Sequence, residues 1–439
     1  MSQDAGGEHD QYIELEKVEV HGDTLMFRFS YHEMLDPFLN SGLFYAKYDF
    51  PLDEVPLPVV SIPLLGFLAP LGWLTGAEVR LGVVDGVYLR SLTEVSAEYR
   101  RMYPWLKPGK VSADPVKSSP HCDPQRFCVL YSGGVDSACS LIRNIEKLPS
   151  ALTVRGSPDL PFHDSRYWSR VRKRTKAFLD GLGVESHVVE TNVQGLVNQQ
   201  AVRDHFRGKL KTGWWEDLAF GLFYLSVSAP YAYHGQIGNV IIGSSNTAKD
   251  QAPWGSTPMT DEKVRWGDVR VVHDSYELSR AEKIRDVIIP YAASRGIEVP
   301  LRVCIGRRSA IAATDQLNCG ECAKCMMVEF VLILSGVDAS GFGFDISPGA
   351  LGRLKQNLEG GRFGRSYDPS TWAFIKEKAR ASPPGVLSEH PGLREFLDWF
   401  ATWDEKPKSR QRLLDRVAPP GSRRRDLARA GFGDRKDSR

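Results

Sequence analysis

The chain has 439 residues, of which 42% are hydrophobic and 25% are charged, so it is long enough for two or three domains with buried cores. Its 56 basic and 54 acidic side chains leave a formal charge of +2, which excludes a protein that is basic throughout, such as one that coats DNA. The charge is uneven, because residues 405–439 carry a net charge of +7 and the rest of the chain carries −5.

Residues 1–110 are expected to form a β-rich N-terminal domain. Apolar and polar side chains alternate over Tyr12–Phe29 on both sides of a His-Gly-Asp turn, a pattern that predicts a β-hairpin. A second hairpin is predicted over residues 77–92, since Asp85-Gly86 favours a tight turn. The apolar stretch Ile62–Leu74 is too short to cross a bilayer and contains two prolines, so it is interpreted as core of this domain.

Residues 111–124 contain three prolines and few apolar side chains, which is typical of an interdomain linker. From 125 to 337, short apolar runs alternate with amphipathic segments, and this order predicts a Rossmann-like α/β domain with a parallel sheet between helices. Strands are expected at 127–131, 151–154, 186–190 and 239–243, and helices at 137–145, 165–182, 215–227 and 277–291.

The region 338–404 is expected to be helical. Three of its segments, 348–358, 369–380 and 391–403, begin with proline, which is favoured in the first turn of a helix. Residues 405–439 are predicted to be a basic, flexible tail, since runs of charge are usually solvated. Contact between this tail and a nucleic acid is the less favoured interpretation.

The strongest signal in the chain is Ser132-Gly133-Gly134-Val135-Asp136-Ser137, which stands between the strand 127–131 and a helix. A loop in this position lies at the carboxyl edge of a parallel sheet, where ligands bind. Two glycines let the backbone approach an oxyanion, and the helix that follows offers free N–H groups. Asp136 would repel a bare phosphate, so its presence indicates Mg²⁺ bound with a polyphosphate.

At this loop the chain resembles the N-type ATP pyrophosphatases, the SGGxDS superfamily, which includes asparagine synthetase, GMP synthetase, NAD synthetase and the QueC-type 7-cyano-7-deazaguanine synthases. The resemblance implies an adenine nucleotide alpha hydrolase type of fold, ATP and Mg²⁺ as cofactors, cleavage between the α- and β-phosphates, and transfer of AMP to a substrate oxygen. The nucleotide-binding residues that it implies are Ser132, Gly133, Gly134, Val135, Asp136, Ser137, Thr153, Val154 and Gly243.

The same resemblance implies catalytic roles for Asp136, Ser137 and Arg280. The segment Leu278–Ile284 is similar to a family segment in which lysine stands at the position of Arg280. A cation there would neutralise charge that develops on phosphate in the transition state. A surface helix with salt-bridge spacing is an equally good interpretation of the segment.

Four of the seven cysteines lie between Cys304 and Cys325. Cys319, Cys322 and Cys325 are separated by two residues each, so one turn can bring three thiolates to an ion, and Cys304 can complete a tetrahedral S₄ shell. The pattern predicts structural Zn²⁺ and a reducing compartment, hence a cytoplasmic protein. An iron–sulfur cluster is the alternative, weakened because no Cys-Pro follows, and four unlinked thiols are the third interpretation.

This cysteine arrangement after an SGGxDS loop resembles the QueC-type enzymes over residues 125–334, about half of the chain. The resemblance implies adenylation of 7-carboxy-7-deazaguanine or a related deazaguanine, followed by attack of ammonia or of a protein amino group to give an amide or nitrile. The segment 249–258 and Gly213–Glu216 depart from the family's substrate motifs. Larger QueC-like proteins with added regions occur in bacterial antiphage defence, and some are thought to attach a deazaguanine to a partner protein.

Two other function classes stay open from the sequence. One is a tRNA-modifying adenylating enzyme that uses the basic tail, and the other is a non-catalytic scaffold that keeps the nucleotide fold for binding alone. Contact with nucleic acid is the less favoured of the partner interactions, no membrane partner is expected, and a homo-oligomer is compatible with the sequence.

Overall fold

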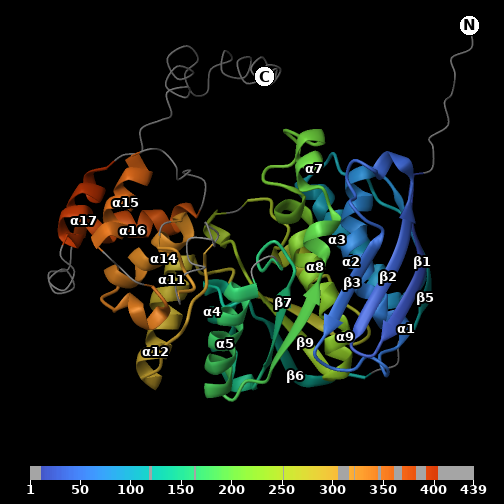
Figure 1. Cartoon of the computed structure of the whole chain (residues 1–439), viewed down its shortest axis with the longest axis horizontal. Coiled ribbons are helices and arrows are strands. Elements are labelled where there is room, and N and C mark those ends of the chain that lie inside the picture. Colours follow the sequence, from blue (N-terminus) through green and yellow to red (C-terminus); the bar gives the residue numbers. More distant parts are fainter. Residues whose placement is uncertain are drawn as a thin grey trace, which may run out of the picture.

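The structure is a computed structural model that describes residues 11–117, 121–162, 165–250, 252–304, 316–320, 322–344, 348–359, 368–381 and 392–403. The tail predicted at 405–439 lies outside these residues. Ten strands of the described chain form one sheet in the order β10-β9-β6-β7-β8-β3-β2-β1-β4-β5 (Figure 1). Within the part of the chain that is described, no helix is both long and apolar enough to cross a bilayer.

Five parallel strands form the half of the sheet that carries the glycine loop. They are β6 (Asp123–Leu130), β7 (Ser150–Arg155), β8 (Ser186–Thr191), β9 (Ile237–Gly243) and β10 (Arg270–Asp274). Counted from β6, their order is 3-2-1-4-5, the doubly wound arrangement in which ligands bind where the strand order reverses, here between β6 and β9. The predicted Rossmann-like α/β architecture is therefore confirmed at the level of the sheet.

The helices around these strands largely follow the predicted segments. They are α4 (Val135–Arg143), α5 (Ser165–Gly181), α8 (Phe220–Val227), α9 (Ala229–His234), α11 (Arg280–Glu282) and α12 (Ile289–Arg295). Two predicted helices contain a π-helical stretch, η3 (Trp215–Ala219) before α8 and η5 (Lys283–Ile288) between α11 and α12. Such insertions are rare and occur frequently at functional sites.

The N-terminal part is mixed α/β rather than purely β-rich. Its elements are β1 (Tyr12–His21), β2 (Thr24–Tyr31), β3 (Leu43–Tyr48), α1 (Leu57–Val60), α2 (Ile62–Thr75), β4 (Glu78–Asp85), α3 (Gly86–Met102) and β5 (Val111–Val116). The first predicted hairpin is confirmed by the antiparallel pair β1–β2. The second is wrong, because Asp85 caps α3 by accepting the N–H of Tyr88 at 2.8 Å instead of starting a turn.

The N-terminal strands extend the sheet that carries the glycine loop. Strand β3 pairs antiparallel with β8, with Ala46 opposite Thr191. The prediction of a linker at 111–124 is wrong over 111–116, since this segment forms β5 and pairs with β4. Pro115 is tolerated there because β5 is the edge strand of the sheet.

The predicted C-terminal helices are present as α15 (Pro348–Glu359), α16 (Pro369–Ala381) and α17 (Leu393–Thr402). They pack around α14 (Ala323–Leu334) at the end of the molecule opposite β1–β5 (Figure 1). The ring of Phe396 stacks on Phe330 of α14 at 5.3 Å, while the Thr371 hydroxyl of α16 accepts the N–H of Ala281 at 3.2 Å. The helical region thus reaches the segment that carries Arg280.

Candidate active site

A cavity of about 700 Å³ lies at the carboxyl ends of β6, β7 and β9. Most of the predicted nucleotide and catalytic residues line it, namely Ser132, Gly134, Val135, Asp136, Ser137, Val154, Gly243 and Arg280. Gly133 and Thr153 do not line the cavity themselves but contact residues that do. The Thr153 hydroxyl donates to the carbonyl of Tyr131 at 2.8 Å, and the Gly133 carbonyl accepts the N–H of Arg302 at 2.7 Å.

Hydrogen bonds of its own serines hold the glycine loop in shape. Gly133 has a φ of +77°, a conformation that a residue with a β-carbon rarely adopts, and Gly134 is the N-cap of α4. The Ser137 hydroxyl donates to the Gly134 carbonyl at 3.1 Å and accepts the N–H of Ser132 at 3.2 Å. The N-terminus of α4 is therefore held at the cavity, where its N–H groups and dipole favour an anion.

Asp136 is the centre of a charge cluster in the cavity. Its two carboxylate oxygens bind Lys283 Nζ at 2.9 Å and Arg280 Nη2 at 3.1 Å. Burial alone would raise the pKa of Asp136, but the charges of Lys283 and Arg280 outweigh it and hold the pKa at about 2. Asp136 is therefore a carboxylate throughout the physiological range, and it holds both cations beside the loop.

Lys283 is a site residue that the sequence analysis missed. Its side chain is 1% exposed, and besides Asp136 it binds the carbonyl of Ser244 at the end of β9. The signal for it was present, since Arg280 and Lys283 are three residues apart and so lie on the same face of the helix they begin. Burial of an ammonium group is costly unless it is paired, so this lysine is held in place by its two partners.

Arg302 is a second missed cation, and it clamps the glycine loop from outside. Its guanidinium donates to the carbonyls of Ser132 at 2.9 Å and Asp159 at 3.1 Å. No carboxylate forms an ion pair with it among the described residues, so its charge stays available to an anion in the cavity. No sequence motif marks this residue.

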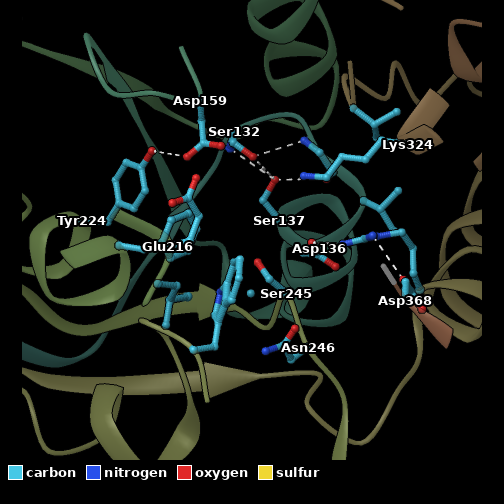
Figure 2. A pocket seen from close by; sticks show the side chains of 18 of the residues that line it. Ser132, Asp136, Ser137, Asp159, Glu216, Tyr224, Ser245, Asn246, Lys324 and Asp368 are labelled. Carbon is cyan, nitrogen blue, oxygen red and sulfur yellow. Dashed lines mark hydrogen bonds and ion pairs between the residues drawn. The ribbon is translucent and has the colours of Figure 1, made fainter. Parts of the chain in front are cut away.

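The helical C-terminal region adds an acidic group to the same cluster. Asp368, just before α16, binds Arg280 Nη1 at 3.2 Å and lines the cavity. Lys324, which lies between two of the clustered cysteines, also lines it. Figure 2 shows Lys324 and Asp368 on one side of the cavity and Glu216, Tyr224 and Asp159 on the other, with Asp136 and Ser137 between them.

Cys304, Cys319, Cys322 and Cys325 come together as a cluster that can hold a metal ion. Their sulfur atoms all lie within 4.8 Å of one another, and Cys325 Sγ is 3.4 Å from Cys322 Sγ and 3.9 Å from Cys319 Sγ. A tetrahedral zinc site with Zn–S bonds of about 2.3 Å separates its sulfurs by about 3.8 Å, so the four thiols fit a single ion. An iron–sulfur cluster would spread the four sulfurs further, because its cysteines are divided among two or four irons instead of binding one ion.

The cysteine cluster is linked to the glycine loop by the short segment from Arg302, which hydrogen-bonds the loop, to Cys304. Cys304 lines the cavity and follows Arg302 by two residues. A metal at the cluster would fix the position of Arg302, and with it the loop. Four protein ligands fill a tetrahedral shell, so such an ion would be structural.

Loss of one ligand of the cluster is expected to release the metal and to destabilise the protein. Replacing Cys319 by serine should abolish a stoichiometric zinc content and lower the thermal midpoint by roughly 5 °C or more, because binding energy of a structural metal is folding energy. Elemental analysis and thermal unfolding measure both. The matched control is Cys122→Ser, a half-buried thiol outside the cluster. Equal zinc and equal midpoints in Cys319→Ser and the wild type would contradict the metal site.

The side of the cavity away from the cysteines is aromatic. Trp215 and Tyr224 pack edge to face with ring centroids 5.6 Å apart. The Tyr224 hydroxyl donates to Asp159 at 2.8 Å, and Glu216 and Trp254 complete this wall. Trp215 and Glu216 lie in the segment Gly213–Glu216, and Trp254 lies in the segment 249–258.

The N-terminal part supports the aromatic wall from behind. Tyr99 of α3 is fully buried, and its hydroxyl donates to the carbonyl of Gly255 at 2.8 Å. Tyr88, also on α3, hydrogen-bonds Ser226 of α8 at 2.6 Å. The N-terminal part is thus attached to the loop and the helix that form this side of the cavity.

Comparison with known proteins adds no identification. No family model matches the chain, and no curated protein shows significant similarity to it.

Proposed function

We propose that this protein is an ATP-dependent enzyme that adenylates the carboxylate of 7-carboxy-7-deazaguanine or a close relative and passes the acyl group to an amine. The observation that carries the proposal is the glycine loop at the β6–β9 switch point, with Lys283, Arg280 and Arg302 gathered around it. Cations and helix N–H groups at one edge of a sheet stabilise the charge of a departing diphosphate.

In the first step a carboxylate oxygen of the substrate attacks the α-phosphorus of ATP. The bond between the α-phosphorus and the bridging oxygen breaks, and pyrophosphate leaves with its electron pair toward the glycine loop. The acyl adenylate is then attacked by an amine, which loses a proton as AMP leaves and an amide forms. Ammonia as the amine gives a primary amide, which a second adenylation can dehydrate to a nitrile, whereas a protein amino group gives a conjugate.

The residues around the loop have separate tasks in this scheme. Lys283 and Arg280 balance the negative charge on the departing pyrophosphate, and Arg302 fixes the loop while adding a third positive charge. Mg²⁺, when bound, would neutralise phosphate charge, and the carboxylates of Asp136 and Asp368 are the oxygen ligands that this part of the cavity offers. Because Asp136 is already paired with two cations, binding of a nucleotide must redistribute these contacts.

Product analysis tests the proposal. The protein is incubated with ATP, Mg²⁺, 7-carboxy-7-deazaguanine and ammonium, or with candidate partner proteins, and the products are identified by mass spectrometry. We expect AMP and pyrophosphate in equal amounts, together with an amide, a nitrile or a protein whose mass has increased by the acyl group. AMP formation that does not depend on the carboxylate substrate would overturn the proposal.

A further inference from the structure

Glu216 is a charged side chain in the cavity that the nucleotide scheme does not use. It lies in the π-helical stretch η3, on the aromatic side of the cavity, and its carboxylate has no ion-pair or hydrogen-bond partner on another described residue. Burial raises its pKa and outweighs the hydrogen bond that the carboxylate accepts from its own backbone N–H. A carboxylate that faces a cavity and has no partner on another residue can accept further hydrogen bonds from a ligand.

Two indole N–H groups lie in the same wall without a hydrogen-bond acceptor. Nε1 of Trp215 and Nε1 of Trp254 are both buried and unpartnered, and both side chains line the cavity. Trp215 as a whole is only 4% exposed. Buried polar groups are usually paired, so these donors point to a ligand that supplies acceptors.

The position of Trp254 relative to Glu216 is fixed by the backbone. The N–H of Gly255 donates to the carbonyl of Glu216 at 2.7 Å, and the carbonyl of Gly255 accepts from Gly221 at 2.8 Å and from the Tyr99 hydroxyl at 2.8 Å. The loop that carries Trp254 is therefore pinned to the helix that carries Glu216. The carboxylate, the two donors and the aromatic rings form one preorganised wall.

The chemistry of this wall selects a planar heterocycle with two adjacent N–H donors. A carboxylate accepts two parallel hydrogen bonds from such an edge, as it does from a guanidinium, and aromatic rings favour a flat partner. A guanine-type ring offers this edge through N1–H and the 2-amino group. Adenine offers a donor beside an acceptor, and the acceptor would be repelled by Glu216, so this side of the cavity does not suit the base of ATP.

We propose that Glu216 determines specificity by binding the N1–H and 2-amino edge of a guanine-type acyl substrate, with Trp254 against the ring. This inference rests on the proposed function, since it takes the heterocycle to be the molecule that is adenylated. It assigns a role to the Gly-Trp-Trp-Glu segment, which stands where the QueC-type enzymes have a different motif.

Calorimetric binding of two free bases to the full chain tests the inference without any chemical step. The probes are 7-deazaguanine and 7-deazahypoxanthine, which differ by the 2-amino group. The wild type is expected to bind 7-deazaguanine at least about 10-fold more tightly, and Glu216→Gln should weaken that binding by about 10- to 100-fold while changing 7-deazahypoxanthine binding much less. Trp254→Phe keeps an aromatic ring and should weaken both bases alike, and exposed Glu146→Gln is the matched control.

The outcomes separate this inference from the proposed function. The inference is overturned if the wild type and Glu216→Gln show the same ratio of affinities for 7-deazaguanine and 7-deazahypoxanthine. It is also overturned if neither base binds to the folded wild type. If AMP forms from ATP and 7-carboxy-7-deazaguanine with the same kcat/KM in Glu216→Gln, the function stands and the inference fails. If bases bind through Glu216 but no AMP forms with any carboxylate, the inference stands and the function fails.

Discussion

Replacement of Lys283 by methionine is expected to lower the rate of pyrophosphate release by about 10²- to 10³-fold, the loss typical when one preorganised charge or donor is removed from a transition state. Methionine keeps most of the length of the buried lysine side chain but removes its positive charge. Asp136 is then bound by Arg280 and no longer by Lys283. The rate is measured with saturating ATP and carboxylate substrate in a coupled pyrophosphate assay.

The control for this prediction is a lysine that also pairs with an aspartate, but on the surface. Lys176 binds Asp180 at 2.8 Å and is 59% exposed, so Lys176→Met should leave the rate within about twofold of the wild type, as expected for an exposed ion pair. Thermal unfolding of both variants separates loss of chemistry from loss of fold. If a folded Lys283→Met variant released pyrophosphate at the wild-type rate, Lys283 would have no role in the mechanism.

Substitution of Gly156 by alanine is expected to destabilise the protein by about 4 kcal/mol or more, one of the largest effects of a single added methyl group. Gly156 follows β7 with a φ of +88°, and a β-carbon there would lie 1.6 Å from the carbonyl oxygen of Thr191. Since Thr191 pairs with Ala46 of β3, relief of the clash would disturb the junction between the two halves of the sheet.

Gly183 provides a matched comparison, because it has a similar φ of +70° but a β-carbon added there would meet no other atom within 4 Å. Gly183→Ala should cost about 1–2 kcal/mol, which is the cost of the left-handed conformation alone. Chemical denaturation of the two variants gives the difference. Equal losses of unfolding free energy in the two variants would show that the close approach of Gly156 to Thr191 does not exclude a β-carbon.

The parallel strands around the glycine loop and the cysteine cluster could be predicted well because their signals are local. A short apolar strand, the loop Ser132–Ser137 and a helix follow one another in the chain, and the three-residue spacing of Cys319, Cys322 and Cys325 brings their sulfurs together. In both cases the residues that cooperate are neighbours in sequence. Local geometry therefore determines most of what they can do.

The errors arose where distant segments decide the outcome. Asp85-Gly86 suits a hairpin turn, but Asp85 can equally cap a helix, and α3 forms because its apolar face packs on the rest of the N-terminal part. Pairing of β3 with β8 joins segments more than 140 residues apart, and no local pattern reveals it. Asp368 reaches Arg280 across 88 positions for the same reason.

The most direct test of the central claim is a crystal structure of the protein with Mg²⁺ and α,β-methylene-ATP, whose α–β linkage resists cleavage. We expect the β- and γ-phosphates within hydrogen-bond distance of the backbone N–H groups of Gly133–Ser137, with Lys283 and Arg280 in contact with the same phosphates. A nucleotide bound elsewhere, or a loop closed against its own side chains at saturating ligand, would contradict the account.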